Sequence, residues 1–300
     1  MSKKQENVGV IFAFIAAAMA GMFPVLVNRG AQSIPPIMFA AITTLLAACG
    51  SFVYAILKGK LHELGNRKSY ASLAMITLCI VVIPYTLFFV GASKTSGVNS
   101  SLLLLSEIIF TLLYTPFIGE ETTINKLLGA MGVLIGASFI LYNGKFGLNT
   151  GDLLVIVSTA TFPIGNFYAK KALNFVSPAI ILFIRFLIGG LLLLALSLVI
   201  EPHSNVLELV LVHWKLILFT GFILLGVGKV VWYEGLKRLD ISKAISLVMT
   251  FPLFSLIFLV GFFNESLSFY QLVGIAIMAV GVFISIKRAS VDAALTRYGT

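Results

Sequence analysis

Ionisable side chains inside otherwise apolar stretches are the residues of this 300-residue chain best suited to chemistry. Glu107, Arg185 and Lys229 each lie well within such a stretch. A charged side chain at bilayer depth costs roughly 2.5–3.5 kcal/mol on insertion scales, so it usually faces a cavity or a partner. A carboxylate can hold an amino group, and the two cations can hold a carboxylate or phosphate. The three residues therefore predict a binding site for a charged or zwitterionic small molecule.

Internal ion pairing is the competing interpretation of such charges. Glu234 precedes Lys237 and Arg238 by three and four residues, a spacing that favours a salt bridge at the headgroup level. Arg185 is long enough to extend its guanidinium toward the membrane surface. Glu107 is too short and too deep to do so. It is therefore the strongest candidate for substrate binding or proton coupling.

Aromatic and amide side chains add a second group of candidate substrate contacts. Tyr85, Asn166 and Trp232 lie in three further apolar stretches, where they could contribute cation–π or hydrogen-bonding contacts. Trp232 also fits the aromatic belt found at membrane interfaces. Prolines within four stretches are candidate hinges, because each removes a backbone hydrogen bond; static kinks are the alternative. These prolines are Pro24, Pro84, Pro163 and Pro252.

The composition indicates what must position these residues. Hydrophobic residues make up 59% of the chain and charged residues 11%, whereas soluble domains are about one quarter charged. Because backbone polar groups in lipid must be paired within a segment, the apolar stretches are expected to be helices. Ten stretches of roughly 17–24 residues match the thickness of a bilayer. They are Val8–Val27, Ile34–Leu57, Tyr70–Val90, Gly97–Phe117, Lys126–Tyr142, Gly151–Ala169, Pro178–Ile200, Trp214–Gly235, Ala244–Phe262 and Tyr270–Ile286.

The distribution of lysine and arginine predicts the orientation. With the N-terminus in the cytoplasm, one set of loops and ends collects fifteen basic residues: Lys3, Lys4, Lys58, Lys60, Arg67, Lys68, Lys126, Lys170, Lys171, Lys237, Arg238, Lys243, Lys287, Arg288 and Arg297. The opposite set collects four: Arg29, Lys94, Lys145 and Lys215. This bias predicts cytoplasmic termini in a prokaryotic cytoplasmic membrane. It also explains the net charge of +9 without a nucleic-acid partner.

An internal duplication divides the chain into two halves, 1–145 and 146–290, followed by a cytoplasmic tail, 291–300. A shift of 145 residues superposes Glu120-Glu121 on Glu265-Ser266, and it brings Gly129 onto Gly274 and Gly136 onto Gly281. Shifts of 142 and 144 align Pro36 with Pro178, Gly91 with Gly235, and Tyr85 with Lys229. Halves of five spans each enter the membrane in opposite directions. Such inverted repeats recur in secondary transporters.

These features resemble the drug/metabolite transporter superfamily, specifically its EamA-type branch. The resemblance rests on the two five-span halves, on the stretch Leu182-Phe183-Ile184-Arg185-Phe186-Leu187 and on the repeated acidic turns with their glycines. It implies ten helices around a central cavity and transport of amino acids, nucleotide-linked compounds or other metabolites, often outward. One departure is Ala20-Gly21-Met22-Phe23-Pro24, where relatives often carry a tryptophan. We therefore expect alternating-access export of a small polar metabolite.

Several alternatives stay open at this stage. A lipid or lipid-linked headgroup flippase also suits a basic cavity, and an intramembrane enzyme or sensor is a further possibility. His62, His203 and His213 lack metal-ligand spacing, and the chain has no glycine-rich phosphate loop, so neither a metal, a cofactor nor an enzyme is expected. Gly132 and Gly136 form a GxxxG motif that packs helices of one chain or of a homodimer. A proton or an exchanged counter-substrate is a candidate partner.

Overall fold

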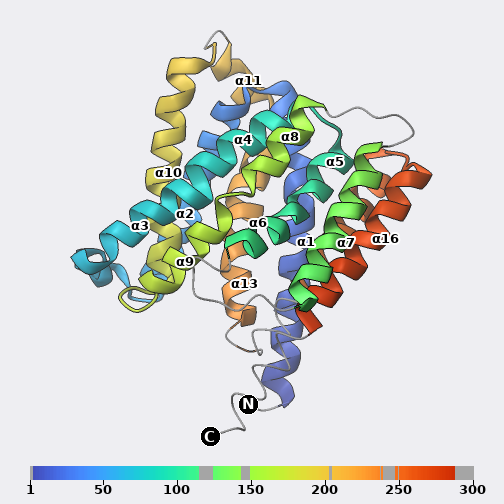
Figure 1. Ribbon diagram of the computed structural model, residues 1–300. Coiled ribbons are helices and arrows are strands. Elements are labelled where there is room, and N and C mark those ends of the chain that lie inside the picture. Colours follow the sequence, from blue (N-terminus) through green and yellow to red (C-terminus); the bar gives the residue numbers. More distant parts are fainter. Residues whose placement is uncertain are drawn as a thin grey trace, which may run out of the picture.

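The computed structural model describes residues 3–114, 124–142, 149–202, 205–236, 238, 247–248 and 250–287, and its regular elements are all helices. They pack side by side as a bundle (Figure 1). Helix α1 (Lys3–Ser33) starts at the end of the bundle where the N-terminus lies, called here the N-terminal end. Helix α11 (Val206–Val212) lies at the opposite end, called the far end. The predicted boundary at 145/146 and the tail 291–300 fall outside the described residues.

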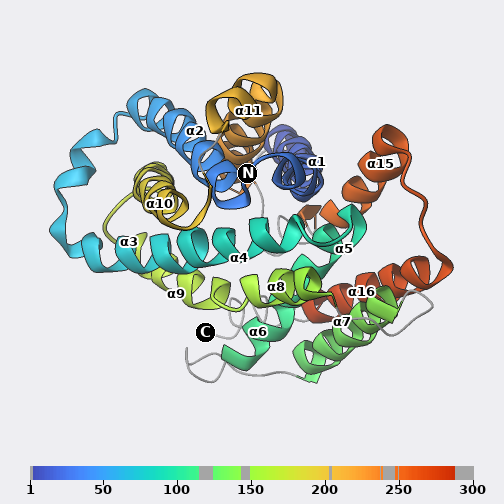
Figure 2. The same cartoon turned by 90° about the horizontal axis from the view of Figure 1, so that it is seen from above.

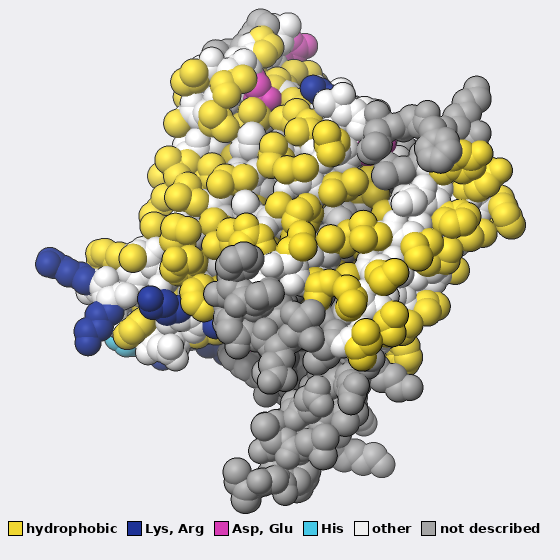
Figure 3. All heavy atoms as spheres, viewed as in Figure 1, with side chains coloured by type: hydrophobic (Ala, Val, Ile, Leu, Met, Phe, Trp, Pro, Cys, Tyr) yellow, Lys and Arg dark blue, Asp and Glu magenta, His cyan; other side chains and the backbone are white. Residues whose placement is uncertain are grey.

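Among the described residues, seven helical segments are long and apolar enough to cross a membrane: Asn7–Ser33, Pro36–Leu57, Arg67–Ala92, Gly97–Tyr114, Thr150–Ala172, Pro178–Ile200 and Trp214–Gly235. Three apolar helices are shorter: Leu127–Ile140, Phe251–Phe263 and Phe269–Gly281. Large apolar side chains cover the outer face (Figure 3), and Val199 is 84% exposed. A water-soluble surface would not carry such a continuous apolar belt. The predicted all-helical membrane architecture is confirmed.

Close helix pairing joins segments far apart in the chain. Helix α2 (Pro36–Leu57) packs along α10 (Pro178–Ile200), and α7 (Ile124–Tyr142) packs along α16 (Phe269–Lys287) (Figure 2). A Cβ on Gly136 would lie 2.6 Å from the Gly274 carbonyl oxygen, and one on Gly281 would lie 2.8 Å from that of Gly129. The GxxxG glycines therefore let two helices of the same chain approach closely.

Two helices contain a π-helical segment at corresponding places. In the first, α3 (Tyr70–Ile76) continues through η3 (Thr77–Val82) into α4 (Ile83–Ala92). In the second, α12 (Trp214–Leu218) continues through η6 (Phe219–Val227) into α13 (Gly228–Leu236). Such segments widen a helix locally and are frequent at functional sites. They lie immediately before Tyr85 and Lys229, the pair that the repeat aligns.

Two of the four candidate hinge prolines lie where a helix starts. Pro163 lies in the first turn of α9 (Phe162–Ala172) and Pro252 in the first turn of α15 (Phe251–Phe263), whereas Pro84 lies where η3 passes without a break into α4. A proline is tolerated in the first turn because its missing N–H would be unpaired there in any case. Pro24 instead lies inside the continuous helix α1.

Carboxylates from each half cap a helix of the other. Glu201 accepts hydrogen bonds from the backbone N–H groups of Ile37 and Met38, at 2.7 and 2.8 Å, at the start of α2. Glu63 accepts one from the Ser177 N–H at 2.5 Å, just before α10. Negative charge is favourable at a helix N-terminus. Burial opposes ionisation of Glu63, but the Ser177 hydrogen bonds and the Lys60 ammonium outweigh it and lower the pKa of this carboxyl.

Candidate functional site

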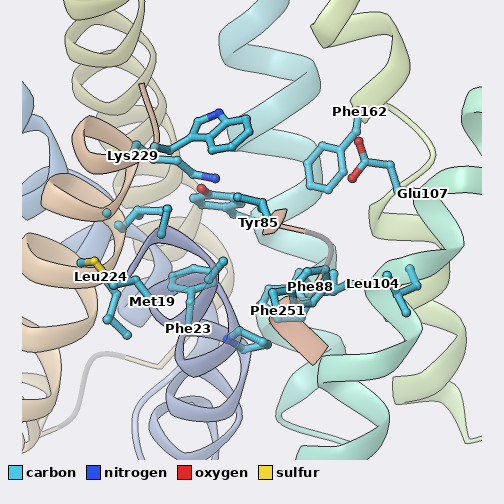
Figure 4. A pocket seen from close by; sticks show the side chains of 18 of the residues that line it. Met19, Phe23, Tyr85, Phe88, Leu104, Glu107, Phe162, Leu224, Lys229 and Phe251 are labelled. Atoms are coloured by element: carbon cyan, nitrogen blue, oxygen red, sulfur yellow. The ribbon is translucent and has the colours of Figure 1, made fainter. Parts of the chain in front are cut away.

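A cavity of about 450 Å³ lies in the interior of the bundle. It is lined by α1 from Ala16 to Pro24, by α4, by α6 (Glu107–Tyr114) and by α13, with further residues from η4 (Leu103–Ser106), α9, η6 and α15. Most of its lining is apolar. The exceptions include Glu107, Lys229 and Tyr85, which place a carboxylate, an ammonium and a hydroxyl at its wall (Figure 4).

Glu107 stands at a break in its transmembrane segment. Helix α5 (Gly97–Leu102) tightens into the 3-10 turn η4 (Leu103–Ser106), and Glu107 then begins α6. The Ser106 hydroxyl bonds to the Leu103 carbonyl and lies 3.1 Å from the Thr159 hydroxyl. These contacts hold the break against α8 (Thr150–Ser158). The carboxylate of Glu107 accepts a long hydrogen bond of 3.4 Å from the Asn166 amide.

Lys229 and Tyr85 form the opposite part of the wall. Figure 4 shows the Lys229 ammonium and the Tyr85 hydroxyl pointing toward one another, with Glu107 across the cavity beside Phe162. Lys229 interacts electrostatically with Glu107 and with Arg185. Within the described chain it has no carboxylate within 4 Å. A charged ammonium at this depth without an ion pair destabilises the folded protein, because its desolvation is not compensated.

Arg185 is the second unpaired cation. Its side chain is buried, with a residue exposure of only 7%, and its guanidinium packs 4.7 Å from the centroid of the Phe186 ring. Its Nε has no hydrogen-bond partner, and it forms no salt bridge with any described residue. Arg185 does not line the cavity directly, but it acts electrostatically on Tyr85 and Lys229. Buried arginine normally has hydrogen-bond partners, so this site is chemically incomplete.

Aromatic rings close the cavity on its far side. Phe23 and Phe88 line it and lie 6.3 Å apart between ring centroids. Behind them Phe89 packs against Phe88 at 5.9 Å and against Phe39 at 5.5 Å, and both Phe39 and Phe89 are fully buried. This cluster separates the charged groups from the far end of the bundle.

A polar network closes the far end beyond these rings. Asp152 accepts hydrogen bonds from the Thr95 hydroxyl, from the Asn99 amide at 2.9 Å and from the Asn149 backbone N–H. Asn28 donates to the carbonyl oxygens of Ala92 and Thr95. The network thereby connects the ends of α1, α4, α5 and α8. Buried hydrogen-bond networks of this kind stiffen the segments that they join.

An ion pair adds to this closure. The Arg29 guanidinium lies 2.7 Å from the Glu265 carboxylate and 4.9 Å from the centroid of the Phe263 ring. The Glu265 carboxylate also packs against Gly97, where a Cβ would lie 2.9 Å from its Oε1. At the N-terminal end, Glu234 pairs with Arg238 at 2.8 Å and accepts a hydrogen bond from the Tyr54 hydroxyl. Glu234 thus forms the predicted surface ion pair.

Most of the predicted substrate-binding residues line the cavity, and two lie outside its wall. Glu107, Lys229, Tyr85, Trp232 and the candidate hinge Pro24 all line the cavity. Arg185 lies behind the wall, and Asn166 is exposed and reaches the site through Glu107. Sequence analysis missed the apolar part of the wall, which only the fold assembles. Its larger members are Met19, Phe23, Phe88, Phe162, Leu224 and Phe251.

Comparison with known proteins identifies the family. The model of the EamA-like transporter family matches residues 7–142 and, separately, 149–287. The chain belongs to the EamA-like transporter family. It is therefore a membrane transporter rather than an enzyme, as the sequence predicted.

Relatives of this EamA-like transporter span most of its length. It is 26% identical over 267 residues to the uncharacterized transporter YoaV of Bacillus subtilis, covering 85% of this chain and 89% of the relative. It is 21% identical over 287 residues to a probable amino-acid metabolite efflux pump of Escherichia coli, covering 92% and 94%. A protein of known crystal structure with 15% sequence identity superposes with a TM-score of 0.66 over 92% of this chain and 95% of the other. This structural similarity shows a shared fold only.

Proposed function

We propose that this EamA-like transporter moves a small polar metabolite carrying an acidic and an amino group, such as an amino acid or a related compound, by alternating access through the central cavity. The observation that carries the proposal is the half-buried ammonium of Lys229 at the cavity wall, with the buried guanidinium of Arg185 behind it and the carboxylate of Glu107 across the cavity. Neither cation forms a salt bridge with a residue that the structure describes. An acidic group of the solute would bond to the Lys229 ammonium and be attracted by the Arg185 charge behind it. An amino group would lie at Glu107. Similarity to a probable amino-acid metabolite efflux pump supports this class and the outward direction.

We further propose ten spans in two inverted halves. The family model matches the chain twice, once in each half. The three shorter apolar helices would complete the seven long ones to ten. The contacts between helices also repeat when the halves are interchanged. Helix α2 of the first half packs on η6 of the second, and α10 of the second half packs on η3 of the first; likewise α1 packs on α13, and α8 packs on α4. Two inverted halves can adopt two mirror-related states, each open to one side.

In this proposal the structure corresponds to a state closed at the far end. The aromatic cluster of Phe23, Phe39, Phe88 and Phe89 and the network around Asp152 separate the cavity from that end. The cavity extends instead along α1 to Ala16 and along α13 to Trp232, toward the N-terminal end. The lysines and arginines in the segments next to α2, α3 and α9 favour that end as the cytoplasmic one. The metabolite would enter the cavity there.

Uptake into proteoliposomes tests the proposal. Purified protein would be assayed with a pooled set of amino acids, nucleotides and quaternary amines, beside Glu107→Gln and the control Glu208→Gln, which alters an exposed residue of α11. Saturable uptake of one compound that only Glu107→Gln abolishes is the expected result. Uptake that survives Glu107→Gln would contradict the site, and movement of lipid analogues alone would favour a flippase.

The same variant separates coupling from binding. If Glu107 carries a proton, Glu107→Gln loses proton-driven flux and retains exchange of solute across the membrane. If Glu107 holds the amino group, both activities are lost together. A pH gradient applied to liposomes loaded with unlabelled solute distinguishes the two outcomes.

A further inference from the structure

A second hollow lies on the outside of the bundle, between α3, η3 and α10. Its volume is about 570 Å³ and its lining is almost wholly apolar. Its buried lining residues are Leu73, Thr77 and Ile180, and the small side chain of Ala74 is exposed within it. The side chains of Leu78, Ile188 and Leu192 are exposed. The groove therefore opens toward the surroundings of the bundle and is distinct from the central cavity.

The length of the groove matches the thickness of one leaflet of the membrane. Along α10 it runs from Ile180 to Leu192, which at 1.5 Å per residue is about 18 Å. Half of a typical hydrocarbon core is about 15 Å. Ile180 lies near the start of α10 at the N-terminal end, so the groove runs from the membrane surface to mid-bilayer. An extended acyl chain has this orientation and length.

The mouth of the groove is basic. Leu64 and Tyr70 line it there, and the Tyr70 hydroxyl donates to the Leu64 carbonyl at 3.1 Å. The turn η2 (Arg67–Ser69) between them presents Arg67 and Lys68, which are exposed and form no salt bridge with any residue that the structure describes. Figure 3 shows Lys and Arg side chains gathered at this end of the apolar surface. Anionic lipid headgroups are attracted to such residues.

The other half of the chain does not repeat the groove. With the shift of 144 residues that relates Gly91 to Gly235, Leu78 corresponds to Phe222. The Phe222 ring packs over Gly50 of α2, where a Cβ would lie 3.5 Å from the ring. An aromatic ring thus occupies the position that stays open beside Leu78. The groove is therefore specific to one face of the bundle.

We infer that the groove between α3, η3 and α10 binds one anionic phospholipid, with an acyl chain along Ala74 and Thr77 and its phosphate at Arg67 and Lys68. The length of the groove selects a chain rather than a compact solute, because burial of apolar area increases with chain length. The two free cations select the headgroup. Each basic residue near a membrane surface is expected to contribute about fivefold in affinity for an anionic lipid.

Native mass spectrometry of delipidated protein tests the inference. Phosphatidylglycerol and phosphatidylcholine would be titrated against the wild type, Ala74→Phe, and the pair Arg67→Gln/Lys68→Gln. We expect a one-to-one phosphatidylglycerol adduct that is at least about tenfold more abundant than the phosphatidylcholine adduct. Both variants should reduce it. Lys170→Gln/Lys171→Gln, which removes two charges from neighbouring α9, should leave it unchanged.

Three results would overturn the inference. One is equal retention of the two lipids by the wild type. Another is a phosphatidylglycerol adduct that survives both Ala74→Phe and Arg67→Gln/Lys68→Gln. The third is a dimer peak that Ala74→Phe removes in place of the lipid adduct, because the groove would then be covered by a second copy. Unchanged elution in size-exclusion chromatography shows that a variant is folded, and Ala74→Gln provides a milder substitution if Ala74→Phe aggregates.

Discussion

The two halves of this transporter repeat a helical plan but carry different chemistry at equivalent positions. Both contain a π-helical segment, in η3 and in η6, and each caps a helix of the other with a carboxylate. The shifts of 142 to 145 residues that relate the halves pair Thr43 with Arg185, Tyr85 with Lys229, and Glu107 with Pro252. Both cations thus come from the second half, and the carboxylate comes from the first.

Because of this difference, the charges around the central cavity are distributed unequally between the two halves, although the backbones of the halves are alike. In the proposed mechanism, two inverted halves let the cavity open to either side, and charges repeated in both halves would make its two walls alike. In the proposed site, Lys229 would instead attract an anion and Glu107 a cation. A bound zwitterion would therefore keep one orientation through the transport cycle. The following predictions test this comparison, from the largest expected effect to the smallest.

Removing either cation of the second half should have the largest effect. In the proposed site, Lys229→Met removes the ammonium that contacts the solute and Arg185→Met removes the charge behind it. Loss of one partner of a buried charge pair typically costs 2–5 kcal/mol, so uptake should fall about 30-fold or more. Lys215→Met, which removes an exposed lysine stacked on Trp214 in the same half, is the matched control. Uptake in proteoliposomes measures both. Normal uptake by both cavity variants would contradict the polar site.

The glycine contact between the halves should govern stability. Gly136→Leu drives a side chain into α16, close to the Gly274 carbonyl oxygen, so overpacking should cost about 1–3 kcal/mol or prevent folding. Gly261→Leu is the control, because a Cβ at Gly261 meets no atom within 4 Å. Thermal unfolding in detergent should separate the two variants. Equal melting temperatures would mean that α7 and α16 are not closely packed.

The network at the far end should control access from that side. Asp152→Ala removes the acceptor for Thr95 and Asn99, which should weaken closure. A Met19→Cys reporter in the cavity wall, in protein with Cys49 and Cys79 changed to serine, would be exposed to an impermeant thiol reagent added at the far side. Labelling should become several-fold faster with Asp152→Ala. An unchanged labelling rate would assign the closure to the aromatic cluster alone.

Tyr85 should contribute less to substrate binding than Lys229, its counterpart in the second half. Tyr85→Phe keeps the aromatic wall but removes the hydroxyl that points toward Lys229 (Figure 4). In the proposed site the hydroxyl bonds to a charged group of the bound solute, and a hydrogen bond of that kind is worth about 1.5–3 kcal/mol, so the apparent KM should rise about tenfold. Uptake kinetics measure the change. A loss as complete as that of Lys229→Met would mean that Tyr85 itself carries the binding.

The capping carboxylates should have the smallest effects. Glu63→Ala should destabilise the protein by about 1 kcal/mol at pH 7, comparable with the loss of a helix cap. Because the pKa of Glu63 is lowered in the folded protein, its contribution is present at neutral pH and is lost as the pH falls through that lowered value. Melting temperatures of wild type and variant should therefore converge in acid. A constant difference down to the acid limit would rule out this charged cap.

Sequence alone could predict the class of fold and part of the site. The long apolar stretches dictated helices, and the depth of Glu107 and Lys229 within them predicted that both would face a cavity. The missing parts depend on long-range packing. Phe23 and Phe88 differ little in sequence context from lipid-facing phenylalanines, and only the crossing of α1 with α4 makes them a wall. The partners of Asp152 come from α5 and two loops, which no spacing rule connects.

The most direct test of the account compares solutes that differ in one charged group. For a metabolite identified by uptake, the analogue without its acidic group and the analogue without its amino group would compete against the labelled compound, in wild type and in Arg185→Met. The account predicts that loss of the acidic group abolishes competition in the wild type and that Arg185→Met reduces the advantage of the complete compound. Equal competition by the complete compound and by the analogue without its acidic group would contradict the assignment of Arg185 and Lys229 as the anion site.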